Sequence, residues 1–225
     1  MIKAILFDCD GVLMDTERLA SKVNIELLAE SGLPLTYEQS RRHLTGKSSD
    51  AVRQWLENHF EVELEDWHAR QEEWQRRFRT GFEKMLPLMP GVNRMFEQLE
   101  LPIAVVSNSG IDELHYKIET TGLDRFIPSH LRFSAQELNM PKPAPGSYLK
   151  AAEQLNIAPE HCIVIEDSVI GATAGLRAGM RVWGFTADSD EQALISTGVH
   201  QCFDHMNQLL NMVQQHNQQT VINKR

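Results

Sequence analysis

Short apolar runs recur along this chain at lengths typical of β-strands. Each run is nearly continuously apolar rather than alternating, which is the pattern of strands covered on both faces in a parallel sheet. The runs are Ile2–Phe7, Pro102–Val106, Cys162–Ile165 and Arg181–Phe185, with a weaker one at Gln201–Phe203. Helical patterns separate the later runs, at Ile111–Thr121, Gly146–Leu155, Val169–Ala178 and Glu191–Thr197. This alternation predicts an α/β fold with a doubly wound parallel sheet.

The interval between the first and second predicted strands breaks this alternation. Amphipathic helical patterns fill it, near residues 17–31, 36–43, 49–59 and 65–84. Such an insert is far longer than an ordinary strand-to-helix connection. We therefore predict a core formed by residues 1–15 and 86–225 and a helical cap domain formed by residues 16–85. Because open α/β sheets bind ligands at the carboxyl ends of their strands, we expect the cap to act as a lid, with a packing role as the alternative.

Composition narrows the class of protein. The 225 residues are 42% hydrophobic and 24% charged, with a net charge of −9, which excludes a disordered chain and disfavours binding to nucleic acid or anionic membranes. No apolar run approaches the roughly 18 residues of a membrane span. Cys9, Cys162 and Cys202 are odd in number and far apart, which favours a reducing compartment over a disulfide framework. We expect a cytoplasmic, monomeric enzyme that binds neither nucleic acid nor membrane.

Two carboxylates, Asp8 and Asp10, directly follow the first predicted strand. Residues at i and i+2 of an extended chain project to the same side, so the pair is expected to share a counter-ion or a proton. A hard cation such as Mg²⁺ satisfies this requirement, and so does a division of roles between nucleophile and general acid. The alternative is two solvated aspartates in a turn. An EF-hand loop is excluded because Val12 and Leu19 stand where it needs oxygen ligands.

The second and third candidate segments carry groups that could hold an anion. Ser107 and Asn108 end the second predicted strand and precede a helix, where a hydroxyl and backbone N–H groups can bind phosphate, although an ordinary helix cap is the alternative. Lys142 lies between Pro141 and Pro143, which restrict the backbone around it. Its ammonium could neutralise a phosphate or a carboxylate nucleophile, and the alternative is a surface lysine in a proline turn.

A fourth segment places Glu166 and Asp167 at the end of a third apolar strand. Adjacent charges at this position are costly unless they bind a partner, so a metal ion is the natural candidate, and a helix cap explains part of the pattern. Gly171, Gly175 and Gly179 form a smooth stripe that indicates close packing of a helix on the sheet. All four segments would meet at one edge of the sheet. Together they supply the parts of a phosphoryl-transfer site.

These four segments, in this order, resemble the motifs of the haloacid dehalogenase superfamily, in the branch of β-phosphoglucomutase and small sugar-phosphate phosphatases. The resemblance covers almost the whole chain. The matching positions are Asp8-Cys9-Asp10-Gly11-Val12, Ser107 with Asn108, Lys142-Pro143-Ala144-Pro145 followed by Tyr148, and Glu166-Asp167-Ser168 with Gly171. Val12 departs from the commoner threonine, as is usual in this branch.

The resemblance implies a Rossmann-like core with an inserted cap and a Mg²⁺-dependent reaction through an aspartyl-phosphate. It assigns Asp8 as the nucleophile and Asp10 as the general acid and base. Its metal ligands would be Asp8, the carbonyl of Asp10 and Asp167, with Glu166 in or near that shell. Its phosphate-binding groups would be Ser107, Asn108 and Lys142. In the cap, Gly46 and Lys47 resemble a loop that contacts the substrate, with a solvated lysine as the alternative.

The acid at the position of Asp10 distinguishes related classes of enzyme. Dehalogenases and phosphonoacetaldehyde hydrolases resemble this chain at the nucleophile but lack an acid at the position of Asp10, so Asp10 favours phosphate esters. We therefore predict a Mg²⁺-dependent phosphatase that hydrolyses small phosphorylated metabolites, with sugar phosphates as the expected substrates. The alternatives are a phosphosugar mutase, which uses the same intermediate, and a non-catalytic binding module that retains the fold.

Overall fold

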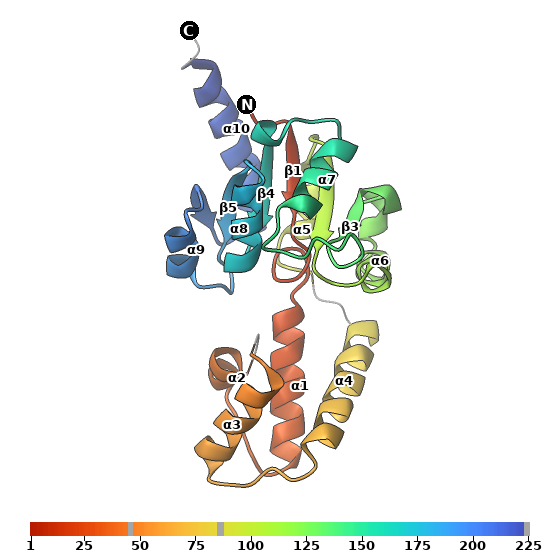
Figure 1. Cartoon of the computed structure of the whole chain (residues 1–225), viewed down its shortest axis with the longest axis vertical. Coiled ribbons are helices and arrows are strands. Elements are labelled where there is room, and N and C mark those ends of the chain that lie inside the picture. Colours follow the sequence, from red (N-terminus) through yellow and green to blue (C-terminus); the bar gives the residue numbers. More distant parts are fainter. Residues whose placement is uncertain (45–46, 85–87, 223–225) are drawn as a thin grey trace. The chain divides into compact units, whose positions relative to one another are not determined.

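The computed structural model describes residues 1–44, 47–84 and 88–222, which form two compact units (Figure 1). The parallel-sheet unit comprises Met1–Met14 and Leu88–Arg225, and the helical unit comprises Asp15–Pro87. No helix among the described residues is long and apolar enough to cross a lipid bilayer.

The described part of the parallel-sheet unit contains a six-stranded sheet in the order β3-β2-β1-β4-β5-β6, and every neighbouring pair is parallel. The strands are β1 (Ala4–Phe7), β2 (Ile103–Ser107), β3 (Arg132–Ser134), β4 (Cys162–Glu166), β5 (Arg181–Phe185) and β6 (Gln201–Phe203). The predicted doubly wound α/β fold is confirmed. The strand β3, which the hydrophobic pattern does not predict, adds an edge beyond β2.

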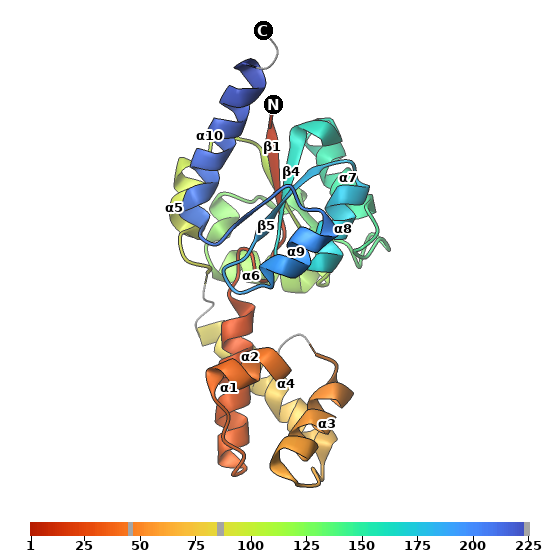
Figure 2. The same ribbon diagram turned by 90° about the vertical axis from the view of Figure 1, so that its left-hand side faces the viewer.

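Helices cover both faces of this sheet. They are α5 (Val92–Gln98), α6 (Ile111–Thr120), α7 (Gly146–Gln154), α8 (Val169–Arg177), α9 (Glu191–Thr197) and α10 (Met206–Ile222). Helices α5 and α10 pack together on one face, and α7 and α8 lie on the other (Figure 2). Three short 3₁₀ turns complete the unit, at Leu123–Arg125, Ser129–Leu131 and Pro159–His161.

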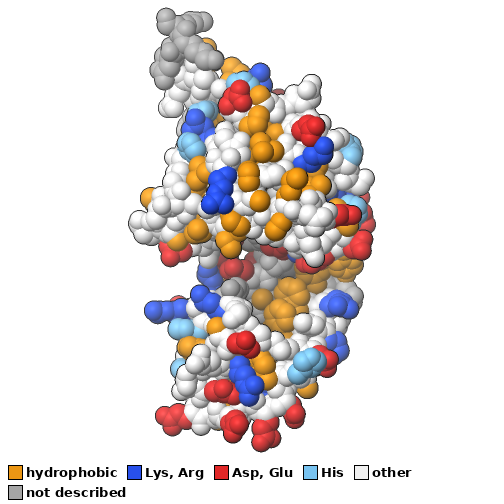
Figure 3. All heavy atoms as spheres, viewed as in Figure 1, with side chains coloured by type: hydrophobic (Ala, Val, Ile, Leu, Met, Phe, Trp, Pro, Cys, Tyr) orange, Lys and Arg blue, Asp and Glu red, His pale blue; other side chains and the backbone are white. Residues whose placement is uncertain are grey.

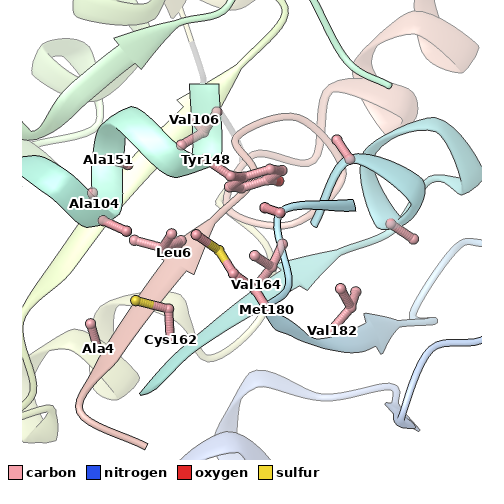
Figure 4. Packing of buried hydrophobic residues seen from close by; sticks show 14 of the residues in the cluster. Ala4, Leu6, Ala104, Val106, Tyr148, Ala151, Cys162, Val164, Met180 and Val182 are labelled. Atoms are coloured by element: carbon pink, nitrogen blue, oxygen red, sulfur yellow. The ribbon is translucent and has the colours of Figure 1, made fainter. Parts of the chain in front are cut away.

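The main core lies between the strands and the helices α7 and α8 (Figure 4). Alternate residues of β1 explain how one strand serves two layers: Leu6 joins this core, while Phe7 packs edge-on against Phe96 of α5, with ring centroids 5.4 Å apart. A Cβ at Gly175 would lie 2.8 Å from Val182, so the predicted close packing is confirmed there. The glycine stripe has other causes elsewhere, because a Cβ at Gly179 would meet no atom within 4 Å, whereas its positive φ of 72° favours glycine.

The helical unit has a core of its own. Its helices are α1 (Thr16–Glu30), α2 (Tyr37–His43), α3 (Ser49–Phe60) and α4 (Trp67–Lys84). Asp15 caps α1, Thr36 and Gln39 form a capping box at α2, and Ser48 caps α3. The largest apolar cluster is formed by Leu28, Leu33, Leu35, Leu44, Leu56 and Leu64. Acidic and basic side chains are interspersed on the visible surface of this unit (Figure 3).

Candidate active site

Three of the predicted segments meet around the ammonium of Lys142. Its Nζ donates to Asp8 Oδ1, lies 2.7 Å from Glu166 Oε1 and 2.9 Å from the carbonyl oxygen of Val106. These residues come from the ends of β1, β2 and β4 and from the loop before α7. The parallel order of the strands places these ends at one edge of the sheet, and so joins positions 134 residues apart in the sequence.

This cluster carries more negative than positive charge. The side chains of Lys142 and Glu166 are 3% and 0% exposed, and Asp8 is buried as well. Burial raises the pKa of Asp8 to about 7, with Glu166 adding to the effect and Lys142 opposing it. Burial would lower the pKa of Lys142, but Asp8 and Glu166 hold it well above its ordinary value. One ammonium therefore faces two buried carboxylates, and a proton or a cation must neutralise the remaining charge.

Glu166 is held by donors from its own unit. Its Oε1 also accepts from the Tyr148 hydroxyl at 2.8 Å, and its Oε2 lies 3.0 Å from Ser168 Oγ. Gly171 makes room for this carboxylate, because a Cβ there would lie 1.7 Å from Oε1. Sequence reasoning assigned Glu166 in or near a metal shell, and the structure adds that it orients Lys142. From the sequence, Tyr148 was identified only as a position of the family motif that follows Lys142, and no role was assigned to it.

Asp167 completes a group of acids. Ligand oxygens of Asp8, Glu166 and Asp167 all lie within 4.8 Å of one another. Gly11 permits this approach: its φ is +80°, and a Cβ there would lie 2.1 Å from Asp167 Oδ2. The three carboxylates offer only oxygen ligands, which suit a hard divalent cation. The single buried ammonium nearby does not neutralise all three. The residues present therefore fit a hard divalent cation.

Asp10 lies in a different environment. The two aspartates do not share a lysine, because Asp8 contacts Lys142 and Asp10 contacts Lys117; a proton or cation shared by the pair stays a prediction. Lys117 Nζ lies 2.7 Å from each carboxylate oxygen of Asp10, and Ser109 Oγ lies 3.3 Å from Oδ2. The physical reason is that β1 ends at Phe7 and the chain turns at Asp10 and Gly11, so the pair does not continue an extended strand.

Lys117 is the residue that sequence reasoning missed. It lies on α6, and its side chain is only 4% exposed although it carries a charge. A signal was available in the helical spacing, since Lys117 shares the buried face of α6 with Leu114 and Ile118. A lysine on the apolar face of a helix needs an acidic partner, but the sequence does not indicate which one.

Ser107 and Asn108 lie beside the cluster and bind neighbouring backbone groups. The Ser107 hydroxyl accepts from Ser109 N at 3.0 Å, and Asn108 Oδ1 accepts from the backbone N–H of Lys142 at 2.9 Å. Asn108 thus fixes the loop that carries Lys142. Ser107 is the last residue of β2 and Asn108 follows it, so both lie at the carboxyl end of that strand.

The helical unit contains a cavity of about 300 Å³ within its own helices. Lys47 lies on its wall, whereas Gly46 lies outside the described residues. The wall is partly apolar, with Trp67 and Trp74, and it carries a second cation, Arg70. The remaining lining residues are Ala20, Asn24, Leu27, Leu28, Leu44, Ser49, Val52, Leu56, Gln71 and Gln75.

Comparisons with known proteins agree with this geometry. Residues 2–179 match the family model of the haloacid dehalogenase-like hydrolases. The chain is 28% identical to the 6-phosphogluconate phosphatase of Escherichia coli (strain K12), over 92% of this chain and 93% of that protein. It is also 28% identical to the phosphorylated carbohydrates phosphatase of Thermotoga maritima, over 88% of this chain and 92% of that one.

A solved structure of similar fold extends the comparison. A HAD family hydrolase from Deinococcus radiodurans, with bound phosphate and sodium, is 30% identical with a TM-score of 0.83. The alignment covers 92% of this chain and 93% of that chain. The likeness therefore includes nearly the whole fold.

Proposed function

The chain belongs to the haloacid dehalogenase-like hydrolase family and is a phosphatase of phosphorylated metabolites; from this premise we propose a Mg²⁺-dependent enzyme that acts on small sugar phosphates through an aspartyl-phosphate. The observation that carries the proposal is the buried contact of Lys142 with Asp8 and Glu166, which leaves an excess of negative charge beside a carboxylate nucleophile. Sugar phosphates as substrates are supported by two relatives, a 6-phosphogluconate phosphatase and a phosphorylated carbohydrates phosphatase.

The proposed reaction has two displacement steps. A carboxylate oxygen of Asp8 attacks phosphorus while the bond to the leaving oxygen breaks, and Asp10 gives that oxygen its proton. Asp10 then takes a proton from water as the water oxygen attacks phosphorus, and the bond to Asp8 breaks to release inorganic phosphate. Lys142, Ser107 and Asn108 hold the phosphoryl oxygens in both steps.

We propose that Asp8, the carbonyl of Asp10 and Asp167 hold Mg²⁺, with Glu166 close by. The ion would supply positive charge against the phosphoryl oxygens and the buried carboxylates. Removal of the metal is expected to abolish turnover, and Mg²⁺ is expected to restore it.

The test is the release of inorganic phosphate by the purified protein from a panel of hexose phosphates and sugar-acid phosphates. We expect release with Mg²⁺ and none with a chelator, and loss of about 10⁴-fold or more in Asp8→Asn. Equal release by Asp8→Asn would contradict the proposed nucleophile. Product analysis on a hexose 1-phosphate tests the phosphosugar mutase, which would yield the isomer without free phosphate, and metal binding without turnover would identify a binding module.

Substrate selection is proposed for the helical unit. We propose that Lys47, which resembles a substrate-contacting residue of the family, favours substrates that carry a second anionic group. We expect Lys47→Ala to raise KM for phosphorylated sugar acids by about tenfold, and to change KM for neutral phosphosugars little. We also propose that the enzyme is a cytoplasmic monomer that binds neither nucleic acid nor membrane, which size-exclusion chromatography with light scattering can test for the oligomeric state.

A further inference from the structure

Three side chains, those of Lys117, Ser109 and Glu113, form a cluster with the carboxylate of Asp10, and of these three Lys117 is the buried one. Besides its contacts with both Asp10 oxygens, Lys117 Nζ lies 2.6 Å from Glu113 Oε1 and 3.1 Å from Ser109 Oγ. The Lys117 side chain is 4% exposed, while that of Asp10 is 34% exposed. The amine is therefore enclosed, and the carboxylate that it holds remains open to solvent on one side.

The geometry of this contact restrains the carboxylate more than a single hydrogen bond would. Both oxygens of Asp10 lie at the same distance, 2.7 Å, from one ammonium. Rotation of the carboxylate about its last bond would lengthen at least one of these contacts. Ser109 Oγ adds a further neighbour on the side of Oδ2. A partly exposed aspartate without such contacts would sample several rotamers.

A structural role alone does not require this arrangement. Lys117 already has an acidic partner on its own helix, because Glu113 lies four residues earlier and forms an ion pair with it. That pair would satisfy the ammonium without a residue from the end of β1. The second carboxylate also means that Lys117 keeps a counter-ion when Asp10 carries the proton that it must donate in the first displacement.

We propose that Lys117 is a positioning residue that holds the Asp10 carboxylate in the orientation for proton transfer to the leaving oxygen and from the attacking water. This inference rests on the proposed function and deepens it. Lys117 exchanges no proton itself. Its removal should therefore impair the steps that need Asp10 and spare a step that does not.

The leaving group of the substrate determines whether formation of the aspartyl-phosphate needs a proton from Asp10. An alkyl phosphate, such as a sugar phosphate, expels a strongly basic alkoxide that needs a proton from Asp10. p-Nitrophenyl phosphate expels a stabilised phenolate that does not. The ratio kcat/KM reports formation of the aspartyl-phosphate, so only the alkyl substrate should be sensitive in that parameter. Hydrolysis of the aspartyl-phosphate needs Asp10 with either substrate, and a burst of p-nitrophenol reports when it becomes slow.

The experiment compares Lys117→Met with the wild type and with Asp10→Asn in the presence of Mg²⁺. We expect kcat/KM of Lys117→Met to fall roughly 100-fold for the sugar phosphate and less than about threefold for p-nitrophenyl phosphate, below the larger selective loss expected of Asp10→Asn. A burst of p-nitrophenol should precede slow turnover. Lys117→Arg is expected to recover part of the selective loss, since its guanidinium can contact both oxygens.

Arg132→Met is the matched control. Arg132 is equally buried, at 3% side-chain exposure, and pairs with Glu119 of the same helix, but it lies on β3 and contacts neither aspartate. Any loss in this variant should be the same for both substrates. If Lys117→Met does not fold, Lys117→Gln, which keeps a hydrogen-bond donor, is measured in its place with the same expected selectivity.

Failure of the role proposed for Lys117 can be distinguished from failure of the proposed function. If the wild type releases phosphate and Asp10→Asn is selective, but the Lys117 variants lose equally on both substrates or lose nothing, the role of Lys117 is overturned and the proposed function stands. If the wild type releases no phosphate from either substrate, or Asp10→Asn shows no selectivity, the proposed reaction itself is overturned, and the role of Lys117 with it.

Discussion

The two aspartates that follow β1 are two residues apart, yet they lie in unlike surroundings. Asp8 is buried in a cluster in which Lys142 faces a second carboxylate, Glu166. Asp10 is one-third exposed and has both oxygens on the ammonium of Lys117. The Asp8 side therefore keeps an excess of negative charge that a cation can neutralise. The Asp10 side holds its carboxylate by local contacts and leaves it accessible to solvent.

This difference matches a division of labour between the two carboxylates. A nucleophile benefits from a fixed position and from neighbours that neutralise the phosphoryl group. A general acid and base must exchange protons with the leaving oxygen and with water, so it needs an orientation but also an open side. Each lysine comes from a different segment, and each can be altered without touching the other.

The largest effect on activity and stability is expected when the ammonium that contacts Asp8 is removed. Lys142→Met leaves Asp8 and Glu166 buried without their ammonium, so we expect kcat/KM to fall by about 10³-fold and stability by about 3–5 kcal/mol. Steady-state kinetics and urea unfolding measure both. Lys150→Met, at an exposed pair with Glu153, should change neither by more than about 0.5 kcal/mol or twofold. An unchanged kcat/KM in Lys142→Met would contradict the proposed need for an ammonium beside Asp8.

An intermediate effect is expected at Gly11, which makes room for Asp167. Gly11→Ala should displace that carboxylate and weaken Mg²⁺ binding by about 10–100-fold, as measured by calorimetry. Gly122→Ala provides the control, because Gly122 has a similar φ of +69° but a Cβ there would meet no atom within 4 Å. The control should cost about 1 kcal/mol of stability and leave Mg²⁺ affinity unchanged. Equal Mg²⁺ affinities in the two variants would contradict a metal-binding role for Asp167.

The smallest effect concerns the pH dependence of Mg²⁺ binding. The pKa of Asp8 is raised to about 7, so a metal that needs the ionised carboxylate must displace a proton below that pH and none above it. The dissociation constant for Mg²⁺ should therefore rise about tenfold per unit as pH falls below 7, with about one proton released per ion. Calorimetry in buffers of different ionisation enthalpy measures this release. Asp8→Asn should lose the pH dependence and Asp10→Asn should keep it, and the opposite pattern would reverse the assignment of the two sides.

The sequence predicts the sheet well because its strands are buried on both faces and therefore read as continuous apolar runs. It does not predict β3, since Arg132–Ser134 is only three residues long and contains Arg132 and Ser134 beside a single aromatic residue. The helix α5, Val92–Gln98, is also not predicted from the hydrophobic pattern. Short elements take their structure from the neighbours on which they pack, and a local pattern does not contain those neighbours.

The same distinction applies to the site. The meeting of Asp8, Lys142 and Glu166 follows from strand order, because ends of parallel strands share one edge of a sheet. The contact between Lys117 and Asp10 depends on the direction in which one helical side chain points, over 107 positions of sequence, and the sequence does not specify it. The separate lysines of Asp8 and Asp10 were not predicted for a related reason, since the prediction extended the strand beyond Phe7.

The position of β1 inside the sheet has a consequence for when activity appears during synthesis of the chain. Among the described strands β1 comes first in the sequence, yet it is flanked by β2 on one side and by β4 on the other, and β4 begins only at Cys162. No nascent fragment shorter than that can bring both flanking strand ends to Asp8. Hydrolytic competence should therefore arrive late and all at once, and a chain interrupted midway through translation should be inert rather than a weak, indiscriminate hydrolase.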